Sequence, residues 1–276
     1  MVTRWLLSSA GVVLLLLMAS CVSQTVPSER TSDSRQLAPP ANNVSLSDNE
    51  HFTFAAVGDL HIGSRDTSRL QRIMTAATAE GDAFLILLGD IVDKGDHDDF
   101  VAVQQALHDG GFDGKVFPML GNHDIFNGGW SEYKAIFGPN YYRFTVGNST
   151  FFAMDTADGT LGAEQMDWLE SELKKPLTTN TFFLSHYLPV IPGQRTYLKL
   201  ADQNEALHLM KLALNHGVAA WLGGHYHSYI QEQIDGVLYV VAGGGGERRM
   251  APVSDYFFVQ VKVDGSSVSA QMNKVD

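Results

Sequence analysis

Five short blocks of the sequence place carboxylate, imidazole and amide side chains next to glycine or at the end of an apolar run. The blocks are Asp59-Leu60-His61, Gly89-Asp90-Ile91-Val92-Asp93, Gly121-Asn122-His123-Asp124, the lone His186, and Gly224-His225-Tyr226-His227. Mixed oxygen and nitrogen ligands favour a hydrolytic first-row metal ion such as Mn, Fe, Zn, Co or Ni over a soft thiolate site. Two such ions about 3.5–4 Å apart can bind phosphoryl oxygens and generate a metal-bound hydroxide. The blocks therefore indicate a dinuclear centre for phosphoester hydrolysis.

Each block also has an ordinary interpretation when it is taken alone. The tripeptide 59–61 could be a turn at the end of a strand, and His186 could be a hydrogen-bonded core histidine. The pair His225 and His227 is a better ligand candidate, because alternate residues of an extended segment point to the same side. Because all five blocks occur together, a metal site is the better joint explanation. Two ions need one bridging carboxylate, and Asp90 is the natural choice.

The blocks follow segments with the patterns of buried strands and amphipathic helices. The apolar runs 52–57 and 83–88 end at Gly-Asp, as in strands buried on both faces. The segment 66–80 between them predicts a helix, because its apolar residues follow the spacing i, i+3, i+4, i+7 (Leu70, Ile73, Met74, Ala77). These three segments form a βαβ unit.

The rest of the chain continues the alternation of strands and helices. We expect a helix that carries Phe100, Val103 and Leu107, then elements at 115–120, 141–146, 150–154, 163–173, 181–184, 203–216 and 218–222. From Tyr229 onward the pattern predicts mostly antiparallel strands. Since ligand sites in open α/β sheets lie beyond the carboxyl ends of the strands, the five blocks can converge on one edge.

The order and spacing of the blocks resemble the calcineurin-like metallophosphoesterase superfamily, whose pattern is DxH, GDxxD, GNH(D/E), a lone His, and GHxH. The resemblance extends from Asp59 to His227. It implies an α/β fold with two packed mixed β-sheets flanked by helices, a four-layer αββα sandwich. It further implies one metal held by Asp59, His61, Asp90 and His227, and another held by Asp90, Asn122, His186 and His225. By the same resemblance, His123 protonates the leaving alkoxide and Asp124 orients the imidazole of His123.

Two features bear on the branch of this superfamily. Purple acid phosphatases have a tyrosine ligand where this chain has Asp93, so a tyrosinate–iron site is not expected; Asp93 itself could be a supporting residue or a structural turn acid. The stretches 141–144, 161–169 and 186–189 are similar to the branch that contains class III cyclic-nucleotide phosphodiesterases. That branch implies a phosphodiesterase.

The charge balance restricts the substrate class. The chain carries a net charge of −12 and has no run of Lys and Arg that could follow a phosphate backbone. Binding of a nucleic-acid polymer is therefore not expected, and a small phosphorylated substrate is. The run Gly243 to Gly246 before Glu247 is interpreted as backbone that lines the cleft. It is not a nucleotide fingerprint, because no strand–GxGxxG–helix context follows.

The N-terminus has the pattern of an export signal. Arg4 precedes an apolar stretch that reaches Met18, and Ala19-Ser20 precede Cys21, the single cysteine of the chain. Met18-Ala19-Ser20-Cys21 resembles the lipobox of bacterial lipoproteins. We therefore predict a signal peptide over 1–20, lipidation of Cys21, a disordered tether over 21–50 and a metallophosphoesterase domain over 51–276. The protein would be an exported, membrane-anchored lipoprotein facing the periplasm or the extracellular side; an uncleaved anchor helix and an ordinary cleaved signal are the alternatives.

Two other functions are compatible with the same residues. A non-catalytic lipoprotein could use the metal site to bind a phosphorylated ligand or a partner protein. A structural envelope protein could carry a vestigial site, but it would have lost ligands, and none is lost here. The intact pair His123-Asp124 argues against pure binding, since binding needs no proton donor.

Overall fold

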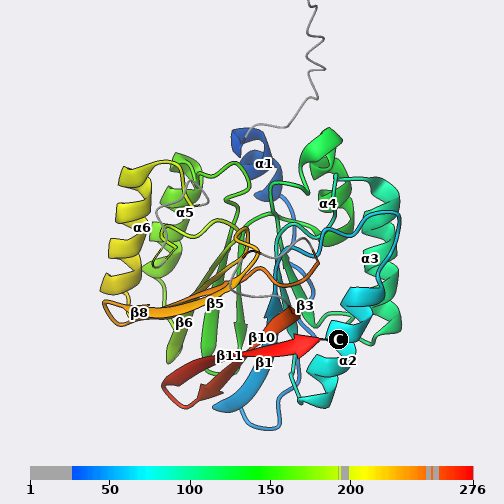
Figure 1. Ribbon diagram of the computed structural model, residues 1–276. Coiled ribbons are helices and arrows are strands. Elements are labelled where there is room, and N and C mark those ends of the chain that lie inside the picture. Colours follow the sequence, from blue (N-terminus) through cyan, green and yellow to red (C-terminus); the bar gives the residue numbers. More distant parts are fainter. Residues whose placement is uncertain (1–26, 192, 194–198, 247–249, 251–254, 276) are drawn as a thin grey trace, which may run out of the picture.

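A computed structural model shows two mixed β-sheets that pack face to face, with helices on their outer faces (Figure 1). The structure describes residues 27–191, 193, 199–246, 250 and 255–275. The order of layers, helix–sheet–sheet–helix, confirms the predicted α/β sandwich.

The first sheet has the strand order β11–β10–β1–β2–β3. Its members are β1 (His51–Val57), β2 (Leu85–Leu88), β3 (Val116–Met119), β10 (Tyr256–Asp264) and β11 (Ser267–Val275). Strands β1, β2 and β3 are parallel, and β10 is antiparallel to both of its neighbours. The parallel strands are joined by the helices α2 (Ser68–Ala79) and α3 (His97–Asp109). The predicted βαβ unit is confirmed.

The second sheet has the order β4–β5–β6–β7–β9–β8. Its members are β4 (Tyr142–Val146), β5 (Ser149–Met154), β6 (Asn180–Ser185), β7 (Val218–Gly223), β8 (Tyr229–Ile234) and β9 (Val237–Ala242). Helices α5 (Ala163–Leu173) and α6 (Gln203–Asn215) cover its outer face. The C-terminal hairpins β8–β9 and β10–β11 are antiparallel, as predicted, but β9 also pairs in parallel with β7.

Three further elements were not predicted. They are α1 (Pro27–Ser34), the short 3₁₀ helix η1 (Phe126–Gly128) and α4 (Trp130–Phe137). The last two lie in the connection between β3 and β4, directly after the block 121–124. Among the described residues, no helix is both long enough and apolar enough to cross a membrane.

The alternation of side chains along the buried strands divides the interior into separate cores. In β1, Phe54 and Ala56 face the second sheet, whereas Ala55 and Val57 face the helices on the outside. Aromatic rings fill the space between the sheets: the Phe54 ring lies 5.5 Å from that of Phe151 in an edge-to-face contact. Such contacts add about 0.5–1.5 kcal/mol each to the burial term. The strands that carry the blocks therefore have rigid support.

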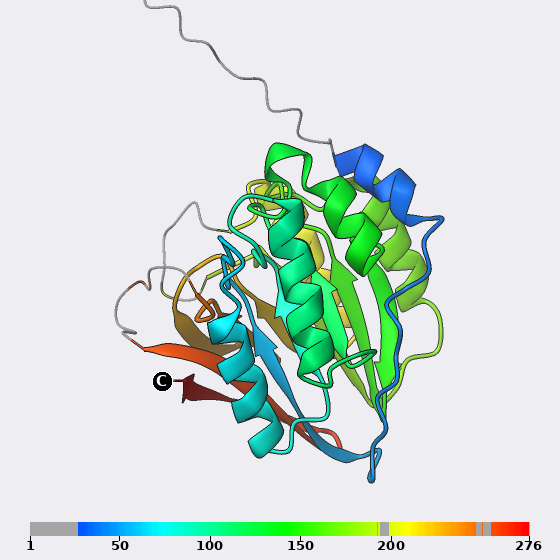
Figure 2. The ribbon, with the colours of Figure 1, turned by 90° about the vertical axis from the view of Figure 1, so that its right-hand side faces the viewer.

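Residues 27–50 correct the prediction of a disordered tether over 21–50. The side chain of Arg30 in α1 is buried, Asn43 N–H donates to Gly114 O at 2.7 Å, and the Asn42 amide donates to Thr145 O at 2.9 Å. Figure 2 shows this segment, in blue, running along the edge of the molecule after α1. The sequence of this segment shows no apolar periodicity, because the contacts that order it are individual polar contacts and not a regular apolar face. The predicted signal peptide and Cys21 lie outside the described residues.

One buried carboxylate generates a prediction about stability. Asp82 accepts a hydrogen bond from the Gln260 amide at 2.9 Å, while its second oxygen is buried without a hydrogen-bond partner among the described residues. Burial raises the pKa of Asp82 to about 6. Since the folded-state pKa lies above the unfolded one, the folded protein loses stability as the pH rises from about 4 to about 6.

We therefore expect Asp82→Asn to raise the free energy of unfolding at about pH 7.5 and to have no effect near pH 4. The gain should be about 1 kcal/mol, because the half-buried group is partly screened by water. Urea unfolding of both proteins at the two pH values measures it. Glu232→Gln, an exposed change of the same charge in β8, is the control. An equal gain at both pH values would contradict the prediction.

Candidate metal centre

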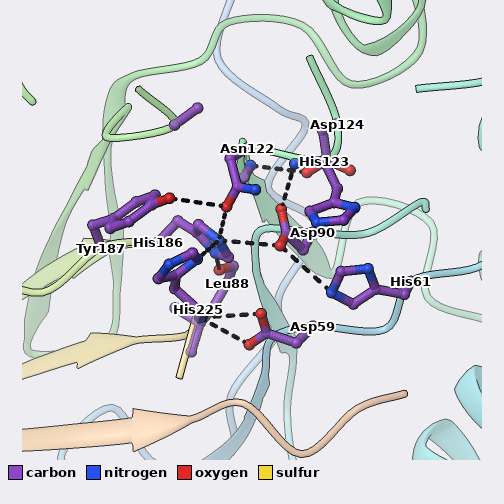
Figure 3. Close-up of polar contacts among 12 residues, drawn as sticks. Asp59, His61, Leu88, Asp90, Asn122, His123, Asp124, His186, Tyr187 and His225 are labelled. Carbon is purple, nitrogen blue, oxygen red and sulfur yellow. Dashed lines mark hydrogen bonds and ion pairs between the residues drawn. The ribbon is translucent and has the colours of Figure 1, made fainter. Parts of the chain in front are cut away.

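The five sequence blocks meet at one place, where carboxyl ends of strands from both sheets lie side by side (Figure 3). Blocks 59–61, 89–93 and 121–124 follow β1, β2 and β3, and the remaining two follow β6 and β7. Two groups of side chains bring their ligand atoms within 4.8 Å of one another: Asp59, His61 and His227, and Asp90, His186 and His225. The expected convergence of the blocks on one edge is confirmed.

The loops that carry these side chains have strained backbones. Four of the proposed ligand residues adopt left-handed conformations: Asp59 (φ 61°), His61 (φ 45°), Asp90 (φ 50°) and His225 (φ 62°). Each such residue costs roughly 1–2 kcal/mol relative to a right-handed conformation. Strain concentrated in this way is typical of a functional site.

Glycines allow the strand ends to approach each other closely. A Cβ atom on Gly89, which has φ +85°, would lie 2.6 Å from His186 Nδ1. A Cβ atom on Gly243 would lie 2.8 Å from a carboxylate oxygen of Asp59. The backbone of Gly243 therefore packs directly against Asp59 of the first group, which agrees with its interpretation as backbone that lines the cleft.

In the first group, Asp59 is fully buried and its Oδ1 lies 3.4 Å from His227 Nε2. Its carboxylate also accepts the backbone N–H of His225, at 2.9 Å. The ring of His61 is buried, and neither of its nitrogens has a hydrogen-bond partner among the described residues. A buried imidazole without hydrogen bonds is costly unless a cation binds it.

In the second group, three acceptor atoms face one another. His186 Nδ1 lies 2.8 Å from Leu88 O, so this nitrogen carries the hydrogen and donates. Its Nε2 therefore offers a lone pair, yet it lies 3.3 Å from Asp90 Oδ2 and 3.1 Å from Asn122 Oδ1. His225 Nδ1 lies 3.3 Å from the same Nε2. Only a cation, either a proton or a metal ion, makes this arrangement favourable.

The pKa shifts of the two histidines agree with this conclusion. Burial would lower the pKa of His186, but the charge of Asp90 outweighs burial and raises the pKa to about 9. Burial and the charge on His186 lower the pKa of His225 to about 3. A proton thus compensates the buried charge of Asp90. Because metal ligands bind in their deprotonated forms, a divalent ion would replace that proton, and the donor set fits such an ion.

The imidazole of His123 lies beside the two groups but is held by a different residue from the one expected. Its Nδ1 lies 2.8 Å from the backbone oxygen of Asp93 and 3.8 Å from the Asp93 carboxylate. The same carboxylate oxygen lies 3.8 Å from Nδ1 of His61. Asp93 therefore stands between the two imidazoles, and His61, Asp93 and His123 form a third group of possible ligands.

Asp124 does not take the position that the resemblance implies. Its carboxylate is fully buried and points into the core, where it accepts the N–H of Val92 at 2.9 Å and that of Gly121 at 2.8 Å. Burial and the charge of Asp90 raise the pKa of Asp124, whereas the two N–H donors oppose that shift. Asp124 thus connects the loops after β2 and β3. The residue that holds the imidazole of His123 is Asp93, through its backbone oxygen.

A profile of the calcineurin-like phosphoesterase family matches residues 52–229, which include all five blocks. The chain belongs to the calcineurin-like phosphoesterases. This family implies divalent metal ions, and the groups described above are candidates to hold them.

The phosphoesterase also has curated relatives. A probable cyclic nucleotide phosphodiesterase of Fibrobacter succinogenes is 27% identical over 201 residues, which cover 67% of this chain and 76% of the relative. A 3′,5′-cyclic-nucleotide phosphodiesterase of Nostoc sp. is 25% identical over 208 residues, 68% of this chain and 76% of the relative. The family and these relatives make the protein a metal-dependent phosphoesterase that acts on a small phosphorylated substrate.

Solved structures agree with the fold of the phosphoesterase. A purple acid phosphatase from yellow lupin aligns with a TM-score of 0.65 at 16% identity, covering 83% of this chain and 53% of its own. A dimetal phosphatase from Danio rerio aligns with a TM-score of 0.59 at 15% identity, covering 81% and 96%. At these identities the similarity shows the fold alone.

Sequence reasoning missed one aromatic residue of the centre, Tyr187. Its hydroxyl lies 3.3 Å from Asn122 Oδ1, and its ring stacks on that of His225 with 3.8 Å between centroids (Figure 3). The only signal in the sequence was its place directly after His186. That position does not reveal a contact with Asn122, which is 65 residues away in the chain.

The different surroundings of Asp93 and Asp124 give a test of their roles. Asp124→Asn would place an amide N–H against a buried backbone N–H, so we expect the free energy of unfolding to fall by about 2 kcal/mol. The more exposed Asp93→Asn should change it by less than about 0.5 kcal/mol. Asp93→Asn should nevertheless lower the rate of ester hydrolysis about tenfold, because it removes the negative charge that lies 3.8 Å from Nδ1 of both His123 and His61.

Urea unfolding and steady-state hydrolysis of a nitrophenyl ester measure both effects on the same preparations. The opposite result, with stability kept and turnover lost in Asp124→Asn, would restore the role that the resemblance implies for Asp124.

Proposed function

We propose that the protein hydrolyses a small phosphodiester with two divalent metal ions. One ion would be held by Asp59, His61, Asp90 and His227, and the other by Asp90, Asn122, His186 and His225. The observation that supports two ions best is the position of one atom: Asp90 Oδ2 lies 3.5 Å from His61 Nε2 and 3.3 Å from His186 Nε2. A single carboxylate that faces both groups suits a bridging ligand. The donor set is compatible with Mn, Fe, Zn, Co or Ni.

The reaction needs an activated water and a proton for the leaving group. When bound, the two ions would neutralise phosphoryl oxygens and lower the pKa of the attacking water. We assign the proton to His123. Because Asp93 O binds its Nδ1, the other nitrogen, Nε2, is available to hold the proton that the leaving alkoxide receives. The side chain is 31% exposed, so it can be reprotonated from solvent after each turnover.

The substrate class follows from the relatives and the charge of the chain. Two relatives carry the names of cyclic-nucleotide phosphodiesterases, which favours a phosphodiester over a monoester. The net charge of −12 disfavours a nucleic-acid polymer. We therefore propose a small organic phosphodiester of nucleotide size. A panel of 3′,5′- and 2′,3′-cyclic nucleotides, glycerophosphodiesters and bis-nitrophenyl phosphate tests this class against nitrophenyl phosphate.

The decisive experiment combines metal analysis with turnover. Protein reconstituted with Mn²⁺ should bind about two equivalents and cleave bis-nitrophenyl phosphate. Asp90→Asn should lose metal and activity together, because it weakens the bridging ligand. His123→Ala should keep the metal, and should lose roughly 10²–10⁴-fold in rate with alkyl esters but much less with nitrophenyl esters, whose leaving group needs no proton.

Two outcomes would count against these assignments. Full activity in Asp90→Asn would exclude a dinuclear mechanism at this centre. An equal loss for alkyl and nitrophenyl esters in His123→Ala would exclude the proton-donor role. Metal binding without turnover on any ester would favour the non-catalytic ligand-binding alternative.

We further propose that the enzyme acts outside the cytoplasm, anchored to a membrane through a lipid on Cys21. The support is the sequence alone: an apolar stretch after Arg4 and the lipobox-like residues 18–21. One acyl chain binds a membrane only marginally, whereas two or more anchor a protein stably. Such an enzyme would reach phosphodiesters of the envelope or the surroundings rather than cytosolic messengers.

Labelling of growing cells with an alkyne fatty acid tests the anchor. Wild-type protein should incorporate the label and fractionate with membranes, and Cys21→Ser should lose the label. Ser23→Ala, two residues away, should behave as wild type. Unlabelled wild-type protein of full length in the membrane fraction would indicate an uncleaved anchor helix, and unlabelled soluble protein an ordinary cleaved signal.

A further inference from the structure

Helix α1 lies outside the region that the family profile matches, residues 52–229, and yet it carries a buried charge. Only 1% of the Arg30 side chain is exposed. The helix lies between α4 and α5, where Figure 1 shows it at the top of the molecule. A charge is buried in this way only when it is paired, so its partners indicate what the helix holds in place.

The partners of Arg30 lie in the turn that follows β5, residues 155–158. Arg30 Nε donates to Asp155 Oδ2 at 2.9 Å, and Arg30 Nη2 donates to Asp158. The second oxygen of Asp155 accepts the N–H of Ala157 at 2.8 Å, which closes the turn. Burial alone would lower the pKa of Arg30, but the two carboxylates raise it, so the side chain stays charged. Arg30 thus neutralises two carboxylates that would otherwise repel each other.

The turn 155–158 also holds the segment that carries Tyr187. Strands β5 and β6 are parallel neighbours in which Met154 pairs with Ser185, so the residues after both strands leave the sheet at the same edge. Thr156 Oγ1 accepts the backbone N–H of Tyr187 at 2.9 Å. The side chain of Thr156 is fully buried, so a shift of the turn moves this contact.

Tyr187 reaches two ligands of the second proposed metal site. Its hydroxyl donates to Asn122 Oδ1 at 3.3 Å, and its ring lies on the His225 ring with 3.8 Å between centroids and 30° between planes. Groups that hydrogen-bond to metal ligands orient them, and their removal usually weakens metal binding about 10–100-fold. The ring of Tyr187 also lies edge-on to that of His186, a third proposed ligand of this site, with 5.3 Å between centroids.

We propose that Arg30 is a positioning residue for the second metal site. It fixes the turn 155–158, the turn fixes Tyr187, and Tyr187 orients Asn122 and His225. The inference rests on the proposed dinuclear function. It assigns α1 a role in metal binding. It predicts that a substitution in α1 lowers the metal affinity of one site and leaves that of the other unchanged.

The experiment titrates metal-depleted protein with Mn²⁺ by calorimetry, which measures metal binding directly, and measures hydrolysis by the Mn²⁺-loaded protein as a second readout. Arg30→Met should weaken one of the two Mn²⁺ equivalents about tenfold and leave the other unchanged. Tyr187→Phe should act on the same equivalent. Because both residues act in one chain of contacts, the double variant should be no weaker than the weaker single variant.

Arg35→Met is the matched control. Arg35 lies five residues further along, is 57% exposed and pairs with the exposed Glu164 at 3.2 Å. The Arg35→Met variant should bind both Mn²⁺ equivalents as the wild type does. Arg30→Lys, which keeps the charge, should recover part of the affinity that Arg30→Met loses.

Each alternative outcome has a distinct meaning. Unchanged Mn²⁺ binding in Arg30→Met, additive losses in the double variant, or equal loss of both equivalents would overturn the inference. If Arg30→Met does not fold, Thr156→Val decides, because it removes the link between the turn and Tyr187; wild-type affinity in that variant would also overturn it. If the wild-type protein binds no Mn²⁺, the proposed function itself fails.

Discussion

The structure depends on one electrostatic constraint, the burial of Asp59 and Asp90 among imidazoles at the junction of two sheets. Two buried carboxylates cannot remain charged unless cations compensate them. The charge of Asp90 accordingly raises the pKa of His186. Metal-cation sites would explain three features: the strained loops, the close approach of the glycines, and the ring nitrogens of His61, which have no hydrogen-bond partner among the described residues. The two buried carboxylates therefore require compensating positive charge, and the divalent ions that the family implies would supply it.

The sandwich makes that burial possible because it supplies rigid strand ends from two directions. Strands β1 to β3 bring the carboxylate and amide ligands and His61 from one sheet, and β6 and β7 bring the other three histidine ligands from the second sheet. Edge-to-face phenylalanine contacts such as Phe54–Phe151 join the two sheets. A left-handed residue such as Asp90 persists only where its surroundings determine its conformation, and this packed layer provides such surroundings.

The sequence predicted the parts of the structure that follow from local pattern. The helix expected at 163–173 forms over those residues, and the five blocks converge, because strand periodicity and parallel order fix where strand ends lie. Side-chain direction within a block was not predictable. Asp124 follows His123 in sequence, but its side chain turns into the core to accept the N–H of Val92. The segment 27–50 was missed because its main tie, Arg30 to Asp155, spans 125 residues and leaves no periodic pattern.

The ordered segment 27–50 also changes what a lipid on Cys21 would mean. A tether over 21–50 would let the domain stand far from a bilayer. With α1 packed on the domain, only residues 22–26 separate Cys21 from Pro27, a span of at most roughly 20 Å. The turn bound by Arg30 leaves the sheet at the same edge as His186, so the proposed anchor would hold the side of the domain that carries the metal centre close to the membrane. Such a placement favours phosphodiesters at or near the bilayer surface over those that must diffuse from the bulk.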